Sequence, residues 1–159
     1  ILFDEPFSAL DAVLRQEMRE EIRNLVKELK ITALFVTHDQ EEAMSISDSI
    51  IVMNKGRIEE QGKPEDIYWH PKTKFVANFV GKATFLDEHH FLRPEDLSFE
   101  EREYKAILHI SSSNCQGGVY NIIGKDEKGR PYYFTSSKPL NKDSSIAVYY
   151  HKESIREVC

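Results

Sequence analysis

The chain has 159 residues, of which 40% are hydrophobic and 30% charged, so it can form one ordinary domain, or one small domain and part of another. Its net charge of −6 argues against a nucleic-acid surface, because such a surface needs a basic face. No apolar run approaches the length that crosses a bilayer and no signal peptide is recognised, so we expect any membrane-spanning part to belong to another subunit. Cys115 and Cys159 lack a Cys-x-x-Cys spacing, and we expect both thiols to stay reduced, as in a cytosol.

Two adjacent carboxylates follow the apolar residues that open the chain. Ile1-Leu2-Phe3 is typical of the end of a buried strand, and Asp4 and Glu5 come where that strand would leave the sheet. In such a place one carboxylate can hold a hydrated Mg²⁺ while its neighbour takes a proton from water. The alternative is that Asp4-Glu5-Pro6 is only a polar strand exit, and these residues alone do not decide between the two interpretations.

An amphipathic helix is predicted over residues 11–30, where apolar residues recur three or four apart. Ser8 and Asp11 have a spacing that suits the start of this helix. We expect most charged residues on its opposite face, Arg15 among them, to be solvated.

A second buried strand is predicted over residues 31–36, a β-branched and apolar run. A strand, a helix and a strand in this order form a right-handed crossover, so both strands end at the same edge of the sheet. We therefore expect Asp4-Glu5 and Thr37-His38 to lie side by side at the carboxyl edge, where open α/β sheets bind ligands.

Three motifs in this order resemble those of a known family. Ile1–Asp11, together with Thr37-His38-Asp39-Gln40-Glu41-Glu42-Ala43, resembles the Walker B, D-loop and H-loop series of an ABC-type ATPase subunit. The Gln-Glu-Glu-Ala after the His-Asp is most similar to subunits that power bacterial importers. The resemblance covers residues 1–80, and the order and spacing of three motifs make it specific.

The resemblance implies a role for each matching residue. Glu5 would polarise the attacking water, His38 would contact the terminal phosphate, and Asp4 would hold Mg²⁺ through water. Ser8-Ala9-Leu10-Asp11 would be the D-loop, which lies across a dimer interface and touches the partner's nucleotide. The intact parent would thus use ATP and Mg²⁺, pair with a second ATPase subunit, and act in the cytoplasm on the inner face of the membrane through transmembrane permease subunits.

The residues that grip a triphosphate are missing. The phosphate-binding pattern G-x-x-x-x-G-K-[ST] does not occur, because Gly62-Lys63, Gly81-Lys82 and Gly124-Lys125 are followed by Pro, Ala and Asp. The Leu-Ser-Gly-Gly-Gln signature is also absent. We therefore expect this chain to be the C-terminal portion of such a subunit, inactive alone and without bound ATP or Mg²⁺.

The middle of the chain is predicted to be a series of short elements. A short helix is expected over 39–46, with Glu41-Glu42 on a solvated face. Asn54-Lys55-Gly56 predicts a hairpin between strands at 49–53 and 57–61. Helices follow at 64–69 and 73–80, and residues 81–92 are predicted to be a linker. His89-His90 is more typical of a solvated linker than of a metal site.

The last third is predicted to be all β. Short strands are expected at 104–111, 118–124, 130–136 and 145–150, which suggests a small barrel of the OB type. Through Leu92-Arg93-Pro94-Glu95-Asp96-Leu97, residues 93–159 resemble the TOBE domain that follows the ATPase in one importer subclass. The predicted fold is a truncated P-loop ATPase α/β domain (1–80), a linker (81–92) and a TOBE-like, OB-like barrel (93–159).

Two functions stay open at this point. The first is the C-terminal portion of the ATP-hydrolysing subunit of an ABC solute importer. The second is a regulatory and dimerisation module that binds a small ligand in the β-domain. A non-transport ATPase of the same superfamily is disfavoured by the appended β-domain. The transported solute is not predicted, since importers of several solutes share these motifs.

Overall fold

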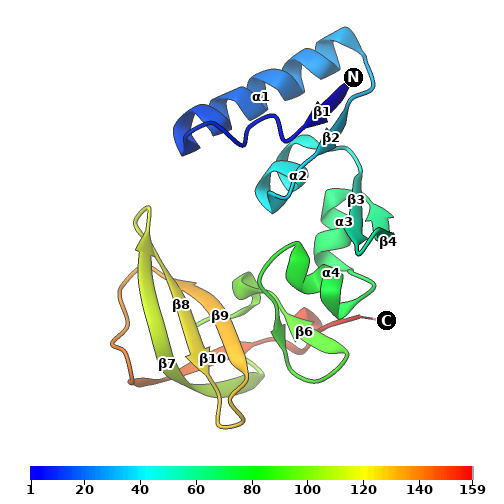
Figure 1. The fold of residues 1–159 in the computed structure, drawn as a ribbon. Coiled ribbons are helices and arrows are strands. Elements are labelled where there is room, and N and C mark those ends of the chain that lie inside the picture. Colours follow the sequence, from blue (N-terminus) through cyan, green and yellow to red (C-terminus); the bar gives the residue numbers. More distant parts are fainter. Residues whose placement is uncertain (159) are drawn as a thin grey trace. The chain divides into compact units, whose positions relative to one another are not determined.

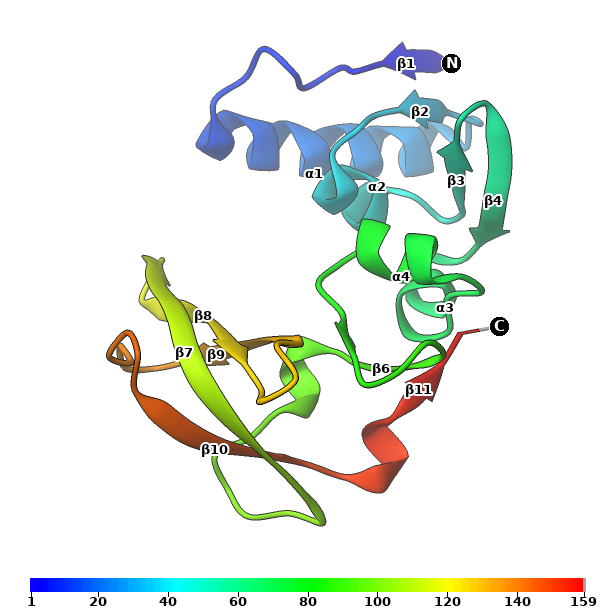
Figure 2. The same ribbon diagram turned by 60° about the horizontal axis from the view of Figure 1, so that its bottom comes forward.

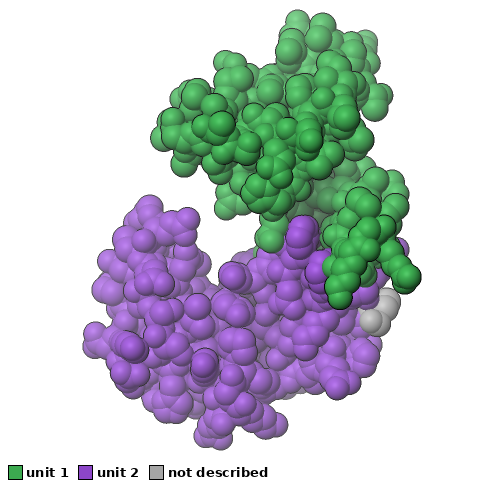
Figure 3. Space-filling view, viewed as in Figure 1, with its two compact units in different colours: residues 1–68 green, residues 69–159 purple. Residues whose placement is uncertain are grey.

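The computed structural model describes residues 1–158, which form two compact units divided between Tyr68 and Trp69 (Figure 3). Cys159, one of the two cysteines expected to be reduced, lies outside the described residues. Within the described residues, the helices are all too short or too polar to cross a membrane.

Unit 1 begins with the predicted β-α-β connection (Figures 1 and 2). Strand β1 (Leu2–Asp4) runs parallel to β2 (Leu34–Val36), and α1 (Ala12–Leu29) connects them. The Asp11 carboxylate accepts two backbone N–H groups at 3.0 and 3.1 Å and so caps the start of α1. The helix ends at Lys30, in the left-handed conformation with φ of 52°.

The two strands of this sheet are exposed, and the prediction that they are buried was wrong for the described residues. Each strand has only the other as a neighbour, and Leu2 and Leu34 are 65% and 57% exposed. The rings of Phe3 and Phe35 stack across the pair with centroids 4.6 Å apart. Helix α1 contains no buried residue. A two-stranded sheet covered on one side cannot bury apolar faces as a wider sheet does.

The rest of unit 1 contains α2 (Gln40–Ile46), β3 (Ile50–Asn54), β4 (Arg57–Gly62) and α3 (Pro64–Trp69), the last of which ends at the boundary. The hairpin β3–β4 is antiparallel as predicted, and its turn places Lys55 and Gly56 at φ of 49° and 76°. Positive φ at both turn positions matches the right-handed twist of the strands. Buried apolar side chains of this unit are Phe7, Ile46, Ile50, Val52 and Ile67.

Unit 2 begins with α4 (Lys74–Phe79) and a small sheet of order β11-β6-β5. Its strands are β5 (Thr84–Phe85), β6 (His90–Leu92) and β11 (Arg156–Glu157). The segment 81–92, predicted as a linker, therefore contains two paired strands. Short strands of two or three residues carry too little periodicity to be recognised. The predicted domain boundaries themselves remain a prediction.

A fully buried arginine at the end of β6 holds α4 and the loop after it against this small sheet. Arg93 is 0% exposed and donates to the carbonyls of Ala77 at 2.8 Å and Lys82 at 3.1 Å. Its guanidinium lies over the ring of Phe91, 5.0 Å from the centroid. The adjacent apolar core comprises Ala77, Ala83, Phe91 and Val158. The 3-10 turn η1 (Pro94–Asp96) follows directly.

A four-stranded antiparallel sheet of order β10-β7-β8-β9 forms the rest of unit 2 (Figure 1). The strands are β7 (Tyr104–Gln116), β8 (Val119–Lys125), β9 (Pro131–Ser136) and β10 (Ser145–Tyr150), close to the predicted ranges. A second 3-10 turn, η2 (Lys152–Ser154), precedes β11. The core of the sheet comprises Leu108, Ile110, Ile122, Tyr132, Phe134 and Val148. The described residues form no closed barrel, so the OB-type prediction is not confirmed.

Candidate functional site

Glu5 and His38 meet at the carboxyl edge of the β1–β2 pair. The Glu5 Oε1 atom lies 2.9 Å from His38 Nδ1, and the side chains are 46% and 78% exposed respectively. The parallel register continues to this point, since the Glu5 N–H donates to the carbonyl of Val36 at 2.8 Å. The β-α-β connection thus brings together two side chains that are 33 positions apart.

The contact changes the titration of the histidine. The hydrogen bond to Glu5 raises the pKa of His38 above its ordinary value, and the negative charge of Glu5 adds to this effect. Asp39 and Glu42 raise the same pKa by smaller amounts. A carboxylate and an imidazole at this separation can share or pass a proton, which is the chemistry of a general acid–base pair.

The backbone of Glu5 has an uncommon conformation. Its φ is 45°, in the left-handed region that residues with a side chain rarely adopt. The hydroxyl of Ser8 donates to the Glu5 carbonyl at 2.9 Å, and the Ser8 N–H donates to it at 3.2 Å. These two bonds hold the turn that aims the Glu5 side chain at His38. Such conformations cluster at functional sites, and no residue pattern in the sequence indicated this one.

Three residues of the segment Ser8-Ala9-Leu10-Asp11, predicted to face a second subunit, make hydrogen bonds within this chain. Ser8 binds the carbonyl of Glu5, and Asp11 caps helix α1. Ala9 is exposed, and the Leu10 N–H donates to the carbonyl of Phe7 at 3.1 Å. The role of this segment at an interface therefore stays a prediction.

Asp4 is exposed at the end of β1 and pairs across the sheet with Val36. No group of three or more His, Cys, Asp or Glu side chains within residues 1–158 converges in a way that could hold a metal ion. Asp4 therefore offers one carboxylate, which suits a water-mediated contact with Mg²⁺ and not a complete set of direct ligands.

A small cavity of about 70 Å³ lies beside the Glu5–His38 pair. Two of the residues that line it were expected to be solvated, and for Glu42 this was wrong, because only 4% of it is exposed. Arg15 reaches into the same cavity, with a side chain that is 31% exposed. The cavity is lined by Glu5, Ser8, Arg15, Thr37, His38, Asp39 and Glu42.

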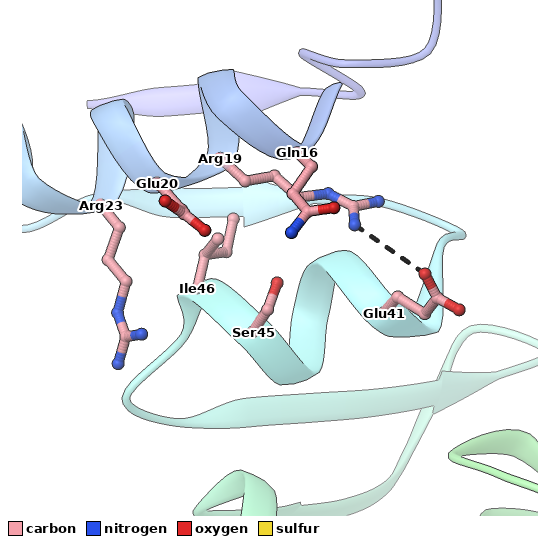
Figure 4. Close-up of a pocket in the computed structure, with 7 residues that line it drawn as sticks. All are labelled: Gln16, Arg19, Glu20, Arg23, Glu41, Ser45 and Ile46. Carbon is pink, nitrogen blue, oxygen red and sulfur yellow. Dashed lines mark ion pairs between the residues drawn. The ribbon is translucent and has the colours of Figure 1, made fainter. Parts of the chain in front are cut away.

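A larger, mixed-charge groove of about 340 Å³ separates α1 from α2 (Figure 4). Arg19 lies within it and comes to 4.0 Å from Glu41, the ion pair drawn in the figure. Arg23, one turn further along α1, makes no ion pair within residues 1–158. The groove is lined by Gln16, Arg19, Glu20, Arg23, Glu41, Ser45 and Ile46.

The chain is similar to known proteins over most of its length. No family model matches the chain. Curated relatives named "Spermidine/putrescine import ATP-binding protein PotA" do match. The protein from Clostridium acetobutylicum is 55% identical over 93% of this chain and 50% of its own length. The protein from Bacillus thuringiensis subsp. konkukian is 45% identical over 80% of this chain and 42% of its own length.

The chain is homologous to a C-terminal region of ABC importer ATP-binding subunits. A relative from Clostridioides difficile, 34% identical, matches 98% of this chain and 53% of its own length. The family resemblance drawn from the three motifs is therefore confirmed. The chain spans about half the length of the curated relatives that it matches.

Proposed function

We propose that this chain contributes the hydrolytic half-site of an ATPase subunit that powers an ABC importer. The observation that carries the proposal is the 2.9 Å contact between Glu5 and His38, formed by two motifs of the family at one sheet edge. Phosphoanhydride hydrolysis needs a fixed base and a charge-sensing group near the terminal phosphate. A base held on a strand end, beside an imidazole that can carry positive charge, suits both requirements.

Each residue of the half-site has a proposed role. Glu5 polarises the attacking water, and His38 contacts the terminal phosphate of ATP. Asp4 accepts hydrogen bonds from water bound to Mg²⁺, which supplies charge neutralisation when the parent binds nucleotide. The segment Ser8-Ala9-Leu10-Asp11 faces the nucleotide of a second ATPase subunit in a homodimer. The exposed positions of Asp4 and Ala9 support these last two assignments.

The chain by itself is proposed to be inactive. Neither the phosphate-binding loop nor the Leu-Ser-Gly-Gly-Gln signature occurs in its sequence, so backbone amides and a lysine for the β- and γ-phosphates are lacking. In the complete subunit these would come from the part that the curated relatives have in addition. That subunit would act in the cytoplasm, bound to transmembrane permease subunits. The polyamine named in the relatives is the first solute to test.

The β-rich part of unit 2 is proposed to be a TOBE-like module that contacts neighbouring subunits. Its open antiparallel sheet and apolar core support a folded module. We still propose that the strands of this sheet are arranged as in an OB-like fold. The alternative function is that this module binds a small regulatory ligand. Saturable binding of such a ligand to this chain without nucleotide would support the alternative.

The decisive experiment replaces Glu5 with Gln in the complete parent protein. The amide keeps the shape of the side chain but accepts no proton, so ATP turnover should fall at least about a hundredfold. Nucleotide affinity, measured by calorimetry with ATP and Mg²⁺, should stay unchanged. Near wild-type turnover would reassign the base and overturn the proposed function.

A further inference from the structure

The segment that carries His38 is held together by hydrogen bonds of its own side chains to one another and to its backbone. The Thr37 hydroxyl donates to Glu42 Oε2 at 2.6 Å and accepts the Asp39 N–H at 3.0 Å. Asp39 Oδ1 accepts the N–H groups of Glu41 at 2.9 Å and Glu42 at 3.2 Å. These bonds link residues 37–42 into one hydrogen-bonded segment and restrict the backbone of His38. We call residues 37–42 the histidine segment.

Arginine side chains on α1 hold the histidine segment against this helix. Arg19 Nη2 lies 3.0 Å from Asp39 Oδ2 and 3.3 Å from Glu42 Oε1, and its side chain is only 12% exposed. One turn earlier, Arg15 Nη1 lies 3.5 Å from Asp39, and its Nη2 donates to the Leu10 carbonyl at 2.9 Å. Two cations thus meet two carboxylates, and Arg15 also reaches the loop that follows Glu5.

This arrangement matters because the imidazole of His38 has a hydrogen bond to Glu5 but little packing around it. The His38 side chain is 78% exposed, so it is not held by packing. Its distance from Glu5 depends on where the backbone of the histidine segment lies. Buried or partly buried ion pairs with several hydrogen bonds are well suited to fixing one geometry, because breaking them leaves charges unpaired.

We propose that Arg19, assisted by Arg15, is a positioning residue for hydrolysis, and that it holds the histidine segment so that His38 stays within hydrogen-bonding distance of Glu5. The inference rests on the proposed function only for its effect on turnover. The geometric part concerns this chain alone. A displacement of about 1 Å can cost a catalytic group about a hundredfold in rate, so Arg19→Gln in the complete parent should lower kcat strongly and leave KM for ATP nearly unchanged.

The direct test is an NMR titration of the His38 imidazole in this 159-residue chain. Charged groups of the neighbouring elements lie around the imidazole: Glu5 after β1, Asp39 at the N-cap of α2, Glu42 in α2 and Arg15 on α1. Arg19 acts on it through its ion pairs with Asp39 and Glu42. Removing a cation, with no change of structure, would raise the pKa of His38. Loosening the Glu5 contact would lower it. The loss of a positive charge and the loss of positioning therefore predict shifts of the His38 pKa in opposite directions.

The variants are Arg19→Gln, Thr37→Val and, as the matched control, Arg23→Gln. Arg23 lies on the same helix one turn away and makes no ion pair within residues 1–158. We expect Arg19→Gln and Thr37→Val to lower the pKa of His38. Arg23→Gln should not lower it. Thr37→Val changes no charge, so it also decides the matter if Arg19→Gln fails to fold, as judged by amide spectra.

The outcomes separate the inference from the proposed function. If folded Arg19→Gln or Thr37→Val leaves the pKa of His38 unchanged or raised, the positioning role is overturned. If both variants lower it while Glu5→Gln hydrolyses ATP normally in the complete parent, the positioning role stands and the proposed function fails. If they lower it and Arg19→Gln reduces kcat without raising KM, both stand.

Discussion

Arginine side chains on α1 support the contact between Glu5 and His38 from outside both motifs. Glu5 and His38 each follow a strand-like run, so strand topology alone was enough to predict that they meet. The contacts of Arg19 with Asp39 and Glu42 depend on how α1 and α2 pack. The signal that could have found them is a pair of arginines four residues apart on one helix, opposite two carboxylates on the next.

The turn between β5 and β6 is predicted to depend on pH through Asp87. Its Oδ1 atom accepts the N–H groups of His89 and His90, both at 2.8 Å. These bonds, that of His90 first, lower the pKa of Asp87 to about 2. Because the folded pKa is depressed, the stabilisation is present above the unfolded pKa of about 4 and is lost as the pH falls through about 2.

Replacing Asp87 with Ala should therefore destabilise the chain at neutral pH. The difference in unfolding free energy between wild type and variant should shrink as the pH falls from about 4 towards 2. Urea denaturation at several pH values measures it. Asp87→Asn is the control, since it keeps an acceptor and loses the charge, and it should show a smaller loss with little pH dependence. An equal loss at every pH would show that the charge plays no part.

Among the elements, the predicted helices and the longer strands were confirmed, and the strands β5, β6 and β11 of two or three residues were missed. Helix α1 and the strands β7 to β10 were recognised because each carries a full repeat of its pattern. β7 nevertheless runs to Gln116, five residues past its predicted end at 111, because a bulge between Ile110 and Ser112 lets the strand continue against β8. Bulges have no signature in a single sequence.

The pairing of β7 with β8 requires a glycine at position 124. A methyl group built on Gly124 would lie 2.9 Å from Leu108 Cβ, a residue that is 0% exposed in the core of the sheet. We expect Gly124→Ala to lower the free energy of unfolding by about 1–3 kcal/mol, through overpacking. Gly62→Ala is the control, because its added methyl meets Ile67 at an ordinary 3.5 Å. Equal effects of the two substitutions in urea denaturation would refute this explanation.

At the scale of the whole chain, the sequence suggested a buried parallel sheet that the described residues do not form. An apolar run shows that a strand can be buried, but not how many neighbours it has. In unit 1 the strands β1 and β2 have only each other, so their outward side chains stay exposed. The four strands β7 to β10 were predicted better, because they pair with one another inside the chain.

The contacts inside unit 2 extend beyond the residues that were predicted to form the β-domain. Residues 93–159 contact the segment before them in several places. Strand β11 pairs with β6, and the Tyr133 N–H donates to the Thr84 hydroxyl at 3.2 Å. Arg93 is buried against the carbonyls of Ala77 and Lys82. A chain that begins at residue 93 loses all of these partners.

We therefore expect residues 69–159 to fold cooperatively when expressed alone. Residues 93–159 should be less stable by at least about 2 kcal/mol, because they lose the packing against Phe91 and Leu92, and burying a side chain of this kind contributes about 1.5–3 kcal/mol. Urea denaturation and amide NMR spectra of the two pieces measure the difference. A third piece, 69–159 with Arg93→Met, separates the contribution of the Arg93 guanidinium from that of the small sheet. It retains β5 and β6 but removes the guanidinium, so its stability should fall between the other two. If 93–159 proves as stable as 69–159, the four-stranded sheet is enough to fold the domain by itself. The small sheet β11-β6-β5 would then add no stability to a domain that begins near residue 93.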